Sequence, residues 1–162
     1  MQSCTAPTSA EPTAEPLRRK AGTYMKILVI DGQGGRIGKA LVEELRRRGF
    51  TGRITAVGTN SAATAAMLKA GADEGATGEN PVVVGARRAD VIMGPMGIVA
   101  ANSLLGEITP AMALAVSESE ACKVLVPVNR CRIRVAGVQE MSLGEYTERA
   151  VDTVLAMAEA GK

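Results

Sequence analysis

The chain has 162 residues, enough for one domain with a substantial core and too few for two ordinary domains. Its net charge of +2 and its 2% aromatic content predict neither a broad basic surface nor a stacking platform, which argues against nucleic-acid binding. It has no histidine, and its three cysteines form no CxxC pair, which argues against a zinc site and against Ser-His or Cys-His catalysis.

Residues 1–24 differ from the rest in being rich in Thr, Ser, Ala, Glu and Pro. A polar segment of this kind cannot bury enough apolar surface to fold, so we expect a disordered tail at 1–24 and a folded domain at 25–162. The N-terminus has no apolar signal core, and no apolar run approaches the roughly 18 residues needed to cross a bilayer. We therefore expect a cytoplasmic location without membrane association.

The most informative stretch is 25–39, MKILVIDGQGGRIGK, in which an apolar run ends in four closely spaced glycines before a helical pattern begins. Glycines let the backbone turn tightly and approach an anion, while the amides of a helix N-terminus donate hydrogen bonds to it. We predict a strand, a phosphate-binding loop and a helix over 37–48. The candidate ligand contacts in this stretch are Asp31, Gly32, Gln33, Gly34, Gly35, Gly38 and Lys39.

This loop departs from both common phosphate-binding fingerprints. As a dinucleotide-binding GxGxxG turn it has Ile37 in place of the last glycine, and Gly38 follows one residue late. As a P-loop it keeps Gly38 and Lys39, but Gln33 replaces the first glycine and Ala40 replaces the magnesium-binding Ser or Thr. The competing interpretation is a loop whose glycines only let the first helix pack closely on the first strand.

A second strand is expected at 54–58, followed by an alanine-rich helix that ends at Gly71. In a dinucleotide-binding fold this strand ends in an acid that binds the ribose hydroxyls, or is followed by a basic residue for NADP. The corresponding residues 58–61 are neutral, which weakens both an NAD and an NADP site. Thr59 and Asn60 are candidate ligand contacts, the alternative being that Asn60 or its neighbour caps the next helix.

The crossover that follows is ambiguous. Residues 72–80 are polar and predict a surface loop containing a very short strand. Residues 81–88 include three consecutive valines, which favour a strand, but Asn80 and Pro81 are typical of a helix start. Because a parallel sheet needs a crossover here, we predict a helix over 81–88.

The rest of the chain continues the alternation of strands and helices. A second glycine-rich loop, 94–97, supplies the candidate contacts Gly94 and Gly97, and Asn129 follows a later strand in the same way. The expected elements are strands at 89–93, 123–128 and 133–138, and helices at 98–106, at 109–116 and from 143 onward.

This alternation predicts an α/β fold, a single three-layer Rossmann-like domain with a mostly parallel sheet of about five to six strands flanked by helices. Open sheets of this kind bind ligands beyond the carboxyl ends of their strands, where neighbouring loops meet. We expect the loops 31–38, 58–61, 94–97 and 127–132 to converge at that edge.

Three further side chains have chemical potential there. Cys131 lies between Arg130 and Arg132, which favour a thiolate, but it is also explained as an inert residue of a turn. Asp31 is expected either to meet a bound phosphate or magnesium ion, or to hydrogen-bond the loop amides and hold the turn. Glu107 is expected to face either the site or the solvent.

Several separated segments of the chain, in order, are IDGQGGRIGK, GTNSAATAAMLKAGA, EGATGEN, ANSLLGEITP and VNRC. Together they resemble the short bacterial proteins of the family of domain of unknown function 3842. The resemblance spans about 25–146 and implies a Rossmann-like fold. It implies no activity and no catalytic residue.

The sequence thus predicts a small protein that binds a nucleotide or another phosphorylated metabolite through its first glycine-rich loop. The cofactor is unknown, although a nucleotide or dinucleotide fits the pattern, and no metal site is expected. One alternative is a nucleotide-dependent enzyme, an oxidoreductase or a phosphoryl-transfer protein, that uses Asp31 and Cys131 or Glu107. Another is a non-catalytic subunit that forms a homodimer through the helix expected at 98–105.

Overall fold

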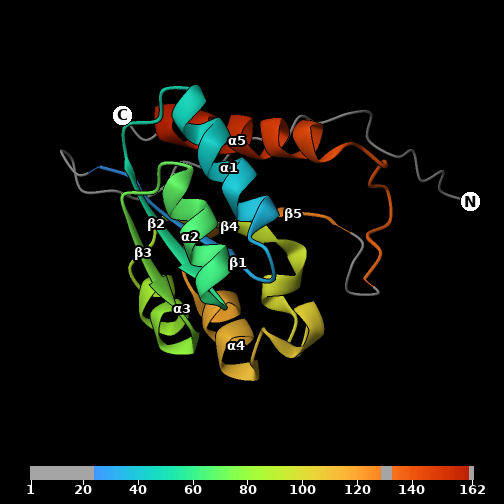
Figure 1. Ribbon diagram of the computed structural model, residues 1–162. Helices are drawn as coiled ribbons and strands as arrows, with labels where there is room; N and C mark the ends of the chain where they lie inside the picture. The colour runs from blue at the N-terminus through green and yellow to red at the C-terminus, as the bar shows by residue number, and fades with distance from the viewer. Residues whose placement is uncertain (1–23, 129–132, 161–162) are drawn as a thin grey trace, which may run out of the picture.

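A five-stranded parallel β-sheet forms the middle layer of the computed structural model, which describes residues 24–128 and 133–160. The strand order is β3-β2-β1-β4-β5, and each neighbouring pair is parallel. Helices lie on both faces of this sheet (Figure 1). The predicted α/β architecture is confirmed. Most of the predicted tail, residues 1–23, lies outside the described residues, as do Asn129 and Cys131.

Strands and helices alternate along the chain. The strands are β1 Lys26–Asp31, β2 Arg53–Gly58, β3 Glu74–Thr77, β4 Val91–Pro95 and β5 Cys122–Val126. The helices are α1 Arg36–Arg47, α2 Ser61–Lys69, α3 Glu79–Ala86, α4 Pro110–Glu118 and α5 Leu143–Ala160, with the 3₁₀ turns η1 Met96–Val99 and η2 Leu104–Gly106. The short strand and the helix predicted for the crossover are confirmed as β3 and α3.

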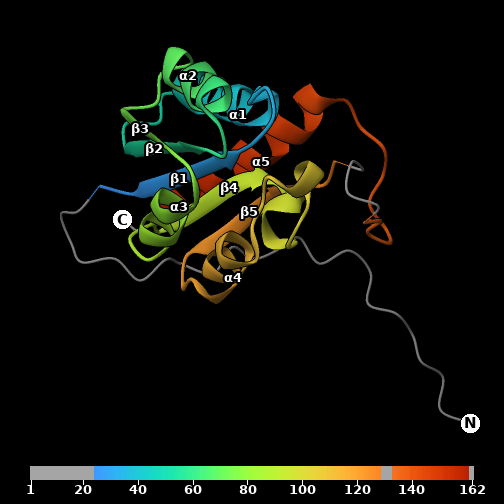
Figure 2. The ribbon, with the colours of Figure 1, turned by 60° about the horizontal axis from the view of Figure 1, so that its bottom comes forward.

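Apolar side chains on both faces of β1 hold the three layers together. Successive side chains of a strand point to opposite faces, so Ile27 and Val29 join the cluster under α1, α2 and α5. Leu28 and Ile30 join the cluster under α3 and α4. Figure 2 shows the same division, with α3 and α4 on the other side of the sheet from α1 and α2. The part of β1 that is buried on both faces, residues 27–30, is therefore apolar.

The sheet changes its direction of growth between β1 and β4. From β1 the chain adds β2 and β3 on one side, and then returns to add β4 and β5 on the other. At such a switch point the two connections leave toward opposite faces, and a crevice opens between them at the carboxyl ends of the strands. The first glycine-rich loop and the connection after β4 meet at this edge.

The helix predicted at 98–106 is wrong. The chain forms the turns η1 and η2 there instead. Asn102, Leu104 and Leu105 have φ angles of 63°, 53° and 60°, in the left-handed region, and a right-handed helix cannot continue through them. The homodimer interpretation that relied on this helix loses its basis.

The strand predicted at 133–138 is also wrong. Residues 133–138 contain a turn, in which the amide of Val138 donates to the carbonyl of Val135 and Gly137 has a φ of 83°. A left-handed residue in a tight turn ends the extended conformation that a strand requires. The strand predicted at 89–93 is confirmed as β4, which begins and ends two residues later, at Val91–Pro95.

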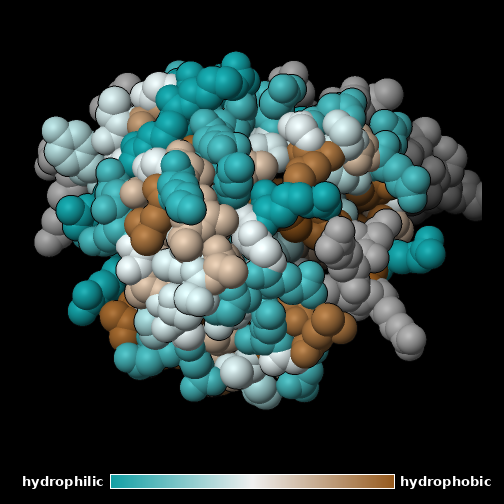
Figure 3. Space-filling model, viewed as in Figure 1, coloured by the Kyte–Doolittle hydropathy of each residue, from teal (hydrophilic) through white to brown (hydrophobic). Residues whose placement is uncertain are grey.

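The surface seen in Figure 3 mixes polar and apolar side chains. Apolar residues on this face lie in several separate patches among hydrophilic ones. Within residues 24–128 and 133–160, no helix is long and apolar enough to cross a membrane.

Candidate functional site

The carboxylate of Asp31 organises the first glycine-rich loop. Asp31 ends β1 with a 4% exposed side chain, and its Oδ1 accepts a hydrogen bond from the Gly32 amide at 2.8 Å. Its Oδ2 accepts from the Gly38 amide, in the first turn of α1, at 2.7 Å. One carboxylate therefore joins the two ends of the loop and supplies an acceptor at the N-terminus of α1. Of the two roles expected for Asp31, the structure shows the contact with the loop amides.

The surroundings of Asp31 act on its pKa in opposite directions. Burial raises the pKa above its ordinary value because the charged form is removed from water. The amides of Gly38, Gly32 and Ile37 lower the pKa, since they donate to the charged form, while the negative charge of Glu107 raises it further. Burial prevails, so the native protein holds this proton more tightly than an exposed carboxyl group would.

Close approach of neighbouring atoms requires glycine at positions 32 and 35 of this loop, as it does at Gly38 in α1. Gly35 has a φ of 67°, and a Cβ added there would lie 2.7 Å from the Cα of Ala63 in α2. A Cβ at Gly32 would lie 2.4 Å from Oε2 of Glu107 and 2.8 Å from Oγ1 of Thr59. At Gly34, by contrast, a Cβ would meet nothing within 4 Å. The loop is thus closely covered at its first and third glycines and open at its second.

The atom that covers Gly32 belongs to Glu107, in the connection between β4 and α4. Oε2 of Glu107 accepts hydrogen bonds from the Gln33 amide at 2.6 Å and from the Thr59 hydroxyl at 2.5 Å. Nδ2 of Asn60 lies 3.4 Å from each carboxylate oxygen. Donors from the ends of β1 and β2 therefore converge on one carboxylate. Of the two positions expected for Glu107, the structure shows the one that faces the site.

Asn60 links the end of β2 to the first glycine-rich loop. Its Oδ1 accepts a hydrogen bond from the Ala63 amide at 2.9 Å and so caps α2, which is one of the two roles predicted for Asn60. Its Nδ2 donates to the carbonyl of Gln33 at 2.9 Å. The end of β2 has no acid of its own, but the fold places the Glu107 carboxylate against it from a distant part of the chain. No local pattern in the sequence indicates this contact, because Asn60 and Glu107 are 47 residues apart.

A small cavity of about 60 Å³ lies at the switch point. It is lined by the first glycine-rich loop, by Gly97 and Leu104 from the connection after β4, and by Val128. Arg36 also lines it, with an exposed side chain that forms no ion pair with the described residues. Neither Arg36 nor Leu104 was among the predicted ligand contacts. Arg36 could have been found from its place as the first residue of α1, directly after the glycines.

The structure places the other predicted contacts differently. Lys39 lies on the outer side of α1, where its Nζ is 3.6 Å from Oε1 of Glu43, and it does not line the cavity. Gly94 is buried within β4, where a Cβ would lie 2.3 Å from the carbonyl oxygen of Ile30. Asn129 lies outside the described residues. Within the described parts of the chain, no group of three or more His, Cys, Asp or Glu could hold a metal ion.

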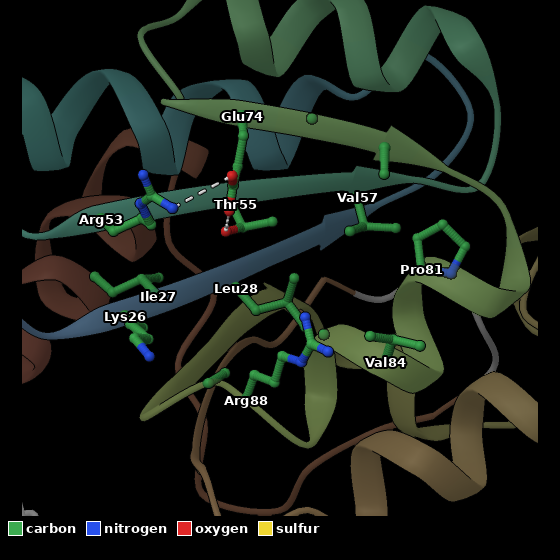
Figure 4. A pocket seen from close by; sticks show the side chains of 14 residues that line it. Lys26, Ile27, Leu28, Arg53, Thr55, Val57, Glu74, Pro81, Val84 and Arg88 are labelled. Atoms are coloured by element: carbon green, nitrogen blue, oxygen red, sulfur yellow. Dashed lines mark hydrogen bonds and ion pairs between the residues drawn. The ribbon is translucent and has the colours of Figure 1, made fainter.

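A larger groove of about 430 Å³ lies elsewhere, between the sheet and α3 (Figure 4). It runs along β1, β2 and β3, and three of its polar side chains bind one another: Oγ1 of Thr55 donates to Glu74 at 2.7 Å, and Arg53 lies 3.5 Å from the same carboxylate. None of the predicted contact residues lines it. The groove has the volume of a ligand site, but it lies away from the carboxyl ends of the strands.

The family of the chain follows from its sequence. The model of the family described as Domain of unknown function (DUF3842) matches residues 26–159, from β1 to the last turn of α5. The chain belongs to the DUF3842 family. The resemblance expected over 25–146 is confirmed, and in this DUF3842 domain the match continues through α5.

Solved structures similar to the DUF3842 domain include two enzymes. One is prephenate dehydrogenase from A. aeolicus in complex with hydroxyphenyl propionate and NAD+, with 20% identity and a TM-score of 0.44, covering 82% of this chain and 40% of that one. The other is a dodecameric FMN-dependent Ubix-like decarboxylase from Escherichia coli O157:H7, with 20% identity and a TM-score of 0.42, covering 85% of this chain and 76% of that one. The chain spans less than half the length of the dehydrogenase. No curated protein matches it.

Proposed function

We propose that this DUF3842 domain is a cytoplasmic protein that binds a nucleotide or another phosphorylated metabolite at the switch point between β1 and β4. The observation that carries the proposal is the set of donors around Glu107. A backbone amide, a hydroxyl and a side-chain amide, from Gln33, Thr59 and Asn60, surround one carboxylate. Phosphate oxygens accept hydrogen bonds from the same donors, so groups that hold a carboxylate also suit a phosphate.

Two further groups beside this set support an anionic ligand. Arg36 presents an exposed guanidinium group at the cavity, and within the described residues it has no acidic partner. The Gly34 amide makes no hydrogen bond with the described residues, and the space beside its Cα is open. An arginine and a free amide at the start of a twelve-residue helix favour phosphate over a neutral ligand.

The hydrogen bonds of Asp31 and Glu107 favour a binding function over a catalytic one. Both oxygens of Asp31 accept hydrogen bonds from loop amides, and the Glu107 carboxylate is held by its own donors. A general base needs an oxygen free to reach the proton that it abstracts. The enzyme alternative therefore gains no support from these two acids.

Titration calorimetry of the full chain tests the proposal. The ligands are ATP, GTP, NAD, NADP and sugar phosphates, each with and without magnesium. We expect at least one to bind, and we expect Arg36→Gln to weaken that binding by about tenfold to a hundredfold, because a hydrogen bond to a charged group contributes about 1.5–3 kcal/mol.

Arg87→Gln is the matched control. Arg87 is also exposed, but it follows α3 on the other face of the sheet, so its substitution removes the same charge away from the cavity. Binding should be unchanged in this variant. The proposal is wrong if the whole panel fails to bind, or if Arg36→Gln and Arg87→Gln weaken binding equally.

A further inference from the structure

The connection between β4 and α4 contains a short closed loop, residues 102–108, that lies over the candidate site. The amide of Asn102 donates to the carbonyl of Ile108 at 2.7 Å and closes the loop at its base. The Ser103 hydroxyl donates to the Gly97 carbonyl at 2.5 Å and ties that base to η1. Figure 2 shows the yellow turns of this connection beside the carboxyl end of β4.

The inner side of this loop fills the candidate site. Glu107 occupies the donors of Gln33, Thr59 and Asn60. Leu104 is 8% exposed, and its Cδ1 would lie 3.0 Å from a Cβ at Gly32. The remaining cavity of about 60 Å³ is far below the roughly 300–1,000 Å³ of small-molecule sites. A nucleotide therefore cannot reach Gly32 unless these two side chains move.

The backbone of the loop is unfavourable in this position. Four non-glycine residues among the described ones have a left-handed φ, and three of them are Asn102, Leu104 and Leu105. The fourth is Gln33, whose amide binds Glu107. Asparagine tolerates this conformation but leucine does not, and the Leu105 side chain is 95% exposed and gains no packing in exchange. Strained backbone of this kind is concentrated at binding sites and switch regions.

We infer that residues 102–108 form a latch, in which Glu107 occupies the place of the ligand's anionic group and leaves when the ligand binds. This inference rests on the proposed function. Opening the latch breaks the hydrogen bonds of Glu107 and exposes Leu104, while it relieves the strain at Leu104 and Leu105. A ligand offsets the lost hydrogen bonds only if it offers the same donors an anionic group, so the latch selects phosphorylated over neutral compounds.

The latch lowers the apparent affinity of the site. When the binding-competent state is a fraction of the population, the measured dissociation constant rises by the inverse of that fraction. Removal of the Glu107 carboxylate should therefore tighten binding, although it removes a polar group from the site. A residue that simply contacted the ligand would show the opposite effect.

The test compares the full chain with Glu107→Ala, and inorganic pyrophosphate is the probe. Calorimetry should show binding that is about tenfold or more tighter in Glu107→Ala. Glu118→Ala, which removes the same charge from an exposed position at the end of α4, should match the unaltered chain. Amide hydrogen exchange in 102–108 should be faster in the free Glu107→Ala variant, and faster in the unaltered chain once pyrophosphate is added.

The outcomes separate the latch from the proposed function. Equal binding by the two proteins, or weaker binding by Glu107→Ala, overturns the latch and leaves the proposed function standing. Unchanged exchange in 102–108 of Glu107→Ala overturns the latch whatever binds. No binding of pyrophosphate by either protein overturns the latch, and the nucleotide and sugar-phosphate panel then decides the proposed function separately. If Glu107→Ala does not fold, Glu107→Gln, which keeps the size of the side chain, must show the same order of affinities.

Discussion

The backbone amide of Gln33 donates a hydrogen bond of 2.6 Å to the carboxylate of Glu107, 74 residues further along the chain. This bond joins the loop after β1 to the connection after β4, the two segments that meet at the switch point of the sheet. It also places an anion from the protein itself among donors suited to a ligand's phosphate.

Gly32→Ala should destabilise the protein, because the added Cβ would lie 2.4 Å from Oε2 of Glu107. The side chains of Glu107 and Thr59 must move to make room, which should lower the free energy of unfolding by about 1–3 kcal/mol. Gly34→Ala is the control, since its Cβ meets open space, and it should change that energy by less than about 0.5 kcal/mol. Urea unfolding curves of both variants measure the difference. Equal destabilisation would contradict the close contact of Glu107 with Gly32.

Asp31→Asn should lower the free energy of unfolding by about 1–3 kcal/mol. Each carboxylate oxygen accepts a different loop amide, whereas asparagine offers one acceptor and turns a donor toward the other amide. Asp90→Asn is a milder change, because Asp90 accepts one amide, from Lys26, which the asparagine oxygen still satisfies. Thermal unfolding of the two variants gives the comparison. An Asp31→Asn variant as stable as Asp90→Asn would exclude the organising role of Asp31.

The contribution of Asp31 to the free energy of unfolding should decrease as the pH rises through the native pKa of its carboxyl group. Folding raises the pKa of this carboxyl group, so the native state binds its proton more tightly than the unfolded state does. The resulting stabilisation is complete below the unfolded pKa, about 3.9, and is lost as the pH rises through the native pKa. Carbon-13 NMR of the carboxyl group measures that native pKa. The native pKa of Asp31 should be lower in Glu107→Gln, because this substitution removes a neighbouring negative charge. A higher pKa in this variant would contradict the proximity of Asp31 and Glu107.

Leu105→Asn should stabilise the protein by up to about 1 kcal/mol. Leu105 is left-handed and 95% exposed, so the substitution relieves backbone strain and removes little packing. Leu105→Ala removes the same exposed side chain but keeps a residue that disfavours this conformation, and it should not stabilise. The denaturant concentrations at the midpoints of unfolding show which of the two variants is more stable. Alanine equal to asparagine would mean that strain at this position is negligible.

The features predicted correctly from the sequence have local signals. Buried strands alternate with helices, and glycines follow β1, so the α/β architecture is readable along the chain. The cap of α2 by Asn60 depends on residues three positions apart. A hydrogen bond between residues so close in the sequence can be predicted without knowledge of the tertiary contacts.

The latch and its contacts lack such signals. Residues 98–106 have the composition of a helix, yet Leu104 and Leu105 have a left-handed conformation that helix propensity disfavours. The loop that contains them is tied to the site by the contacts of Glu107 with Gln33 and Thr59. The bond between Gln33 and Glu107 joins residues 74 positions apart, and no periodicity relates them. Local patterns could therefore locate the glycine-rich loop, but they could not show that an acid of the chain covers it.

A nitrogen-15 NMR titration of the full chain with inorganic pyrophosphate tests most directly whether the glycine-rich loop binds an anion. Binding at the switch point predicts shifts of the Gln33 and Gly34 amides, of the Asn60 side-chain amide and of the amides of 102–108. The groove in Figure 4 supplies an internal comparison, through Arg53 and the other residues that line it. Shifts confined to that groove, or no shifts at all, would contradict the assignment of an anion-binding site to the glycine-rich loop.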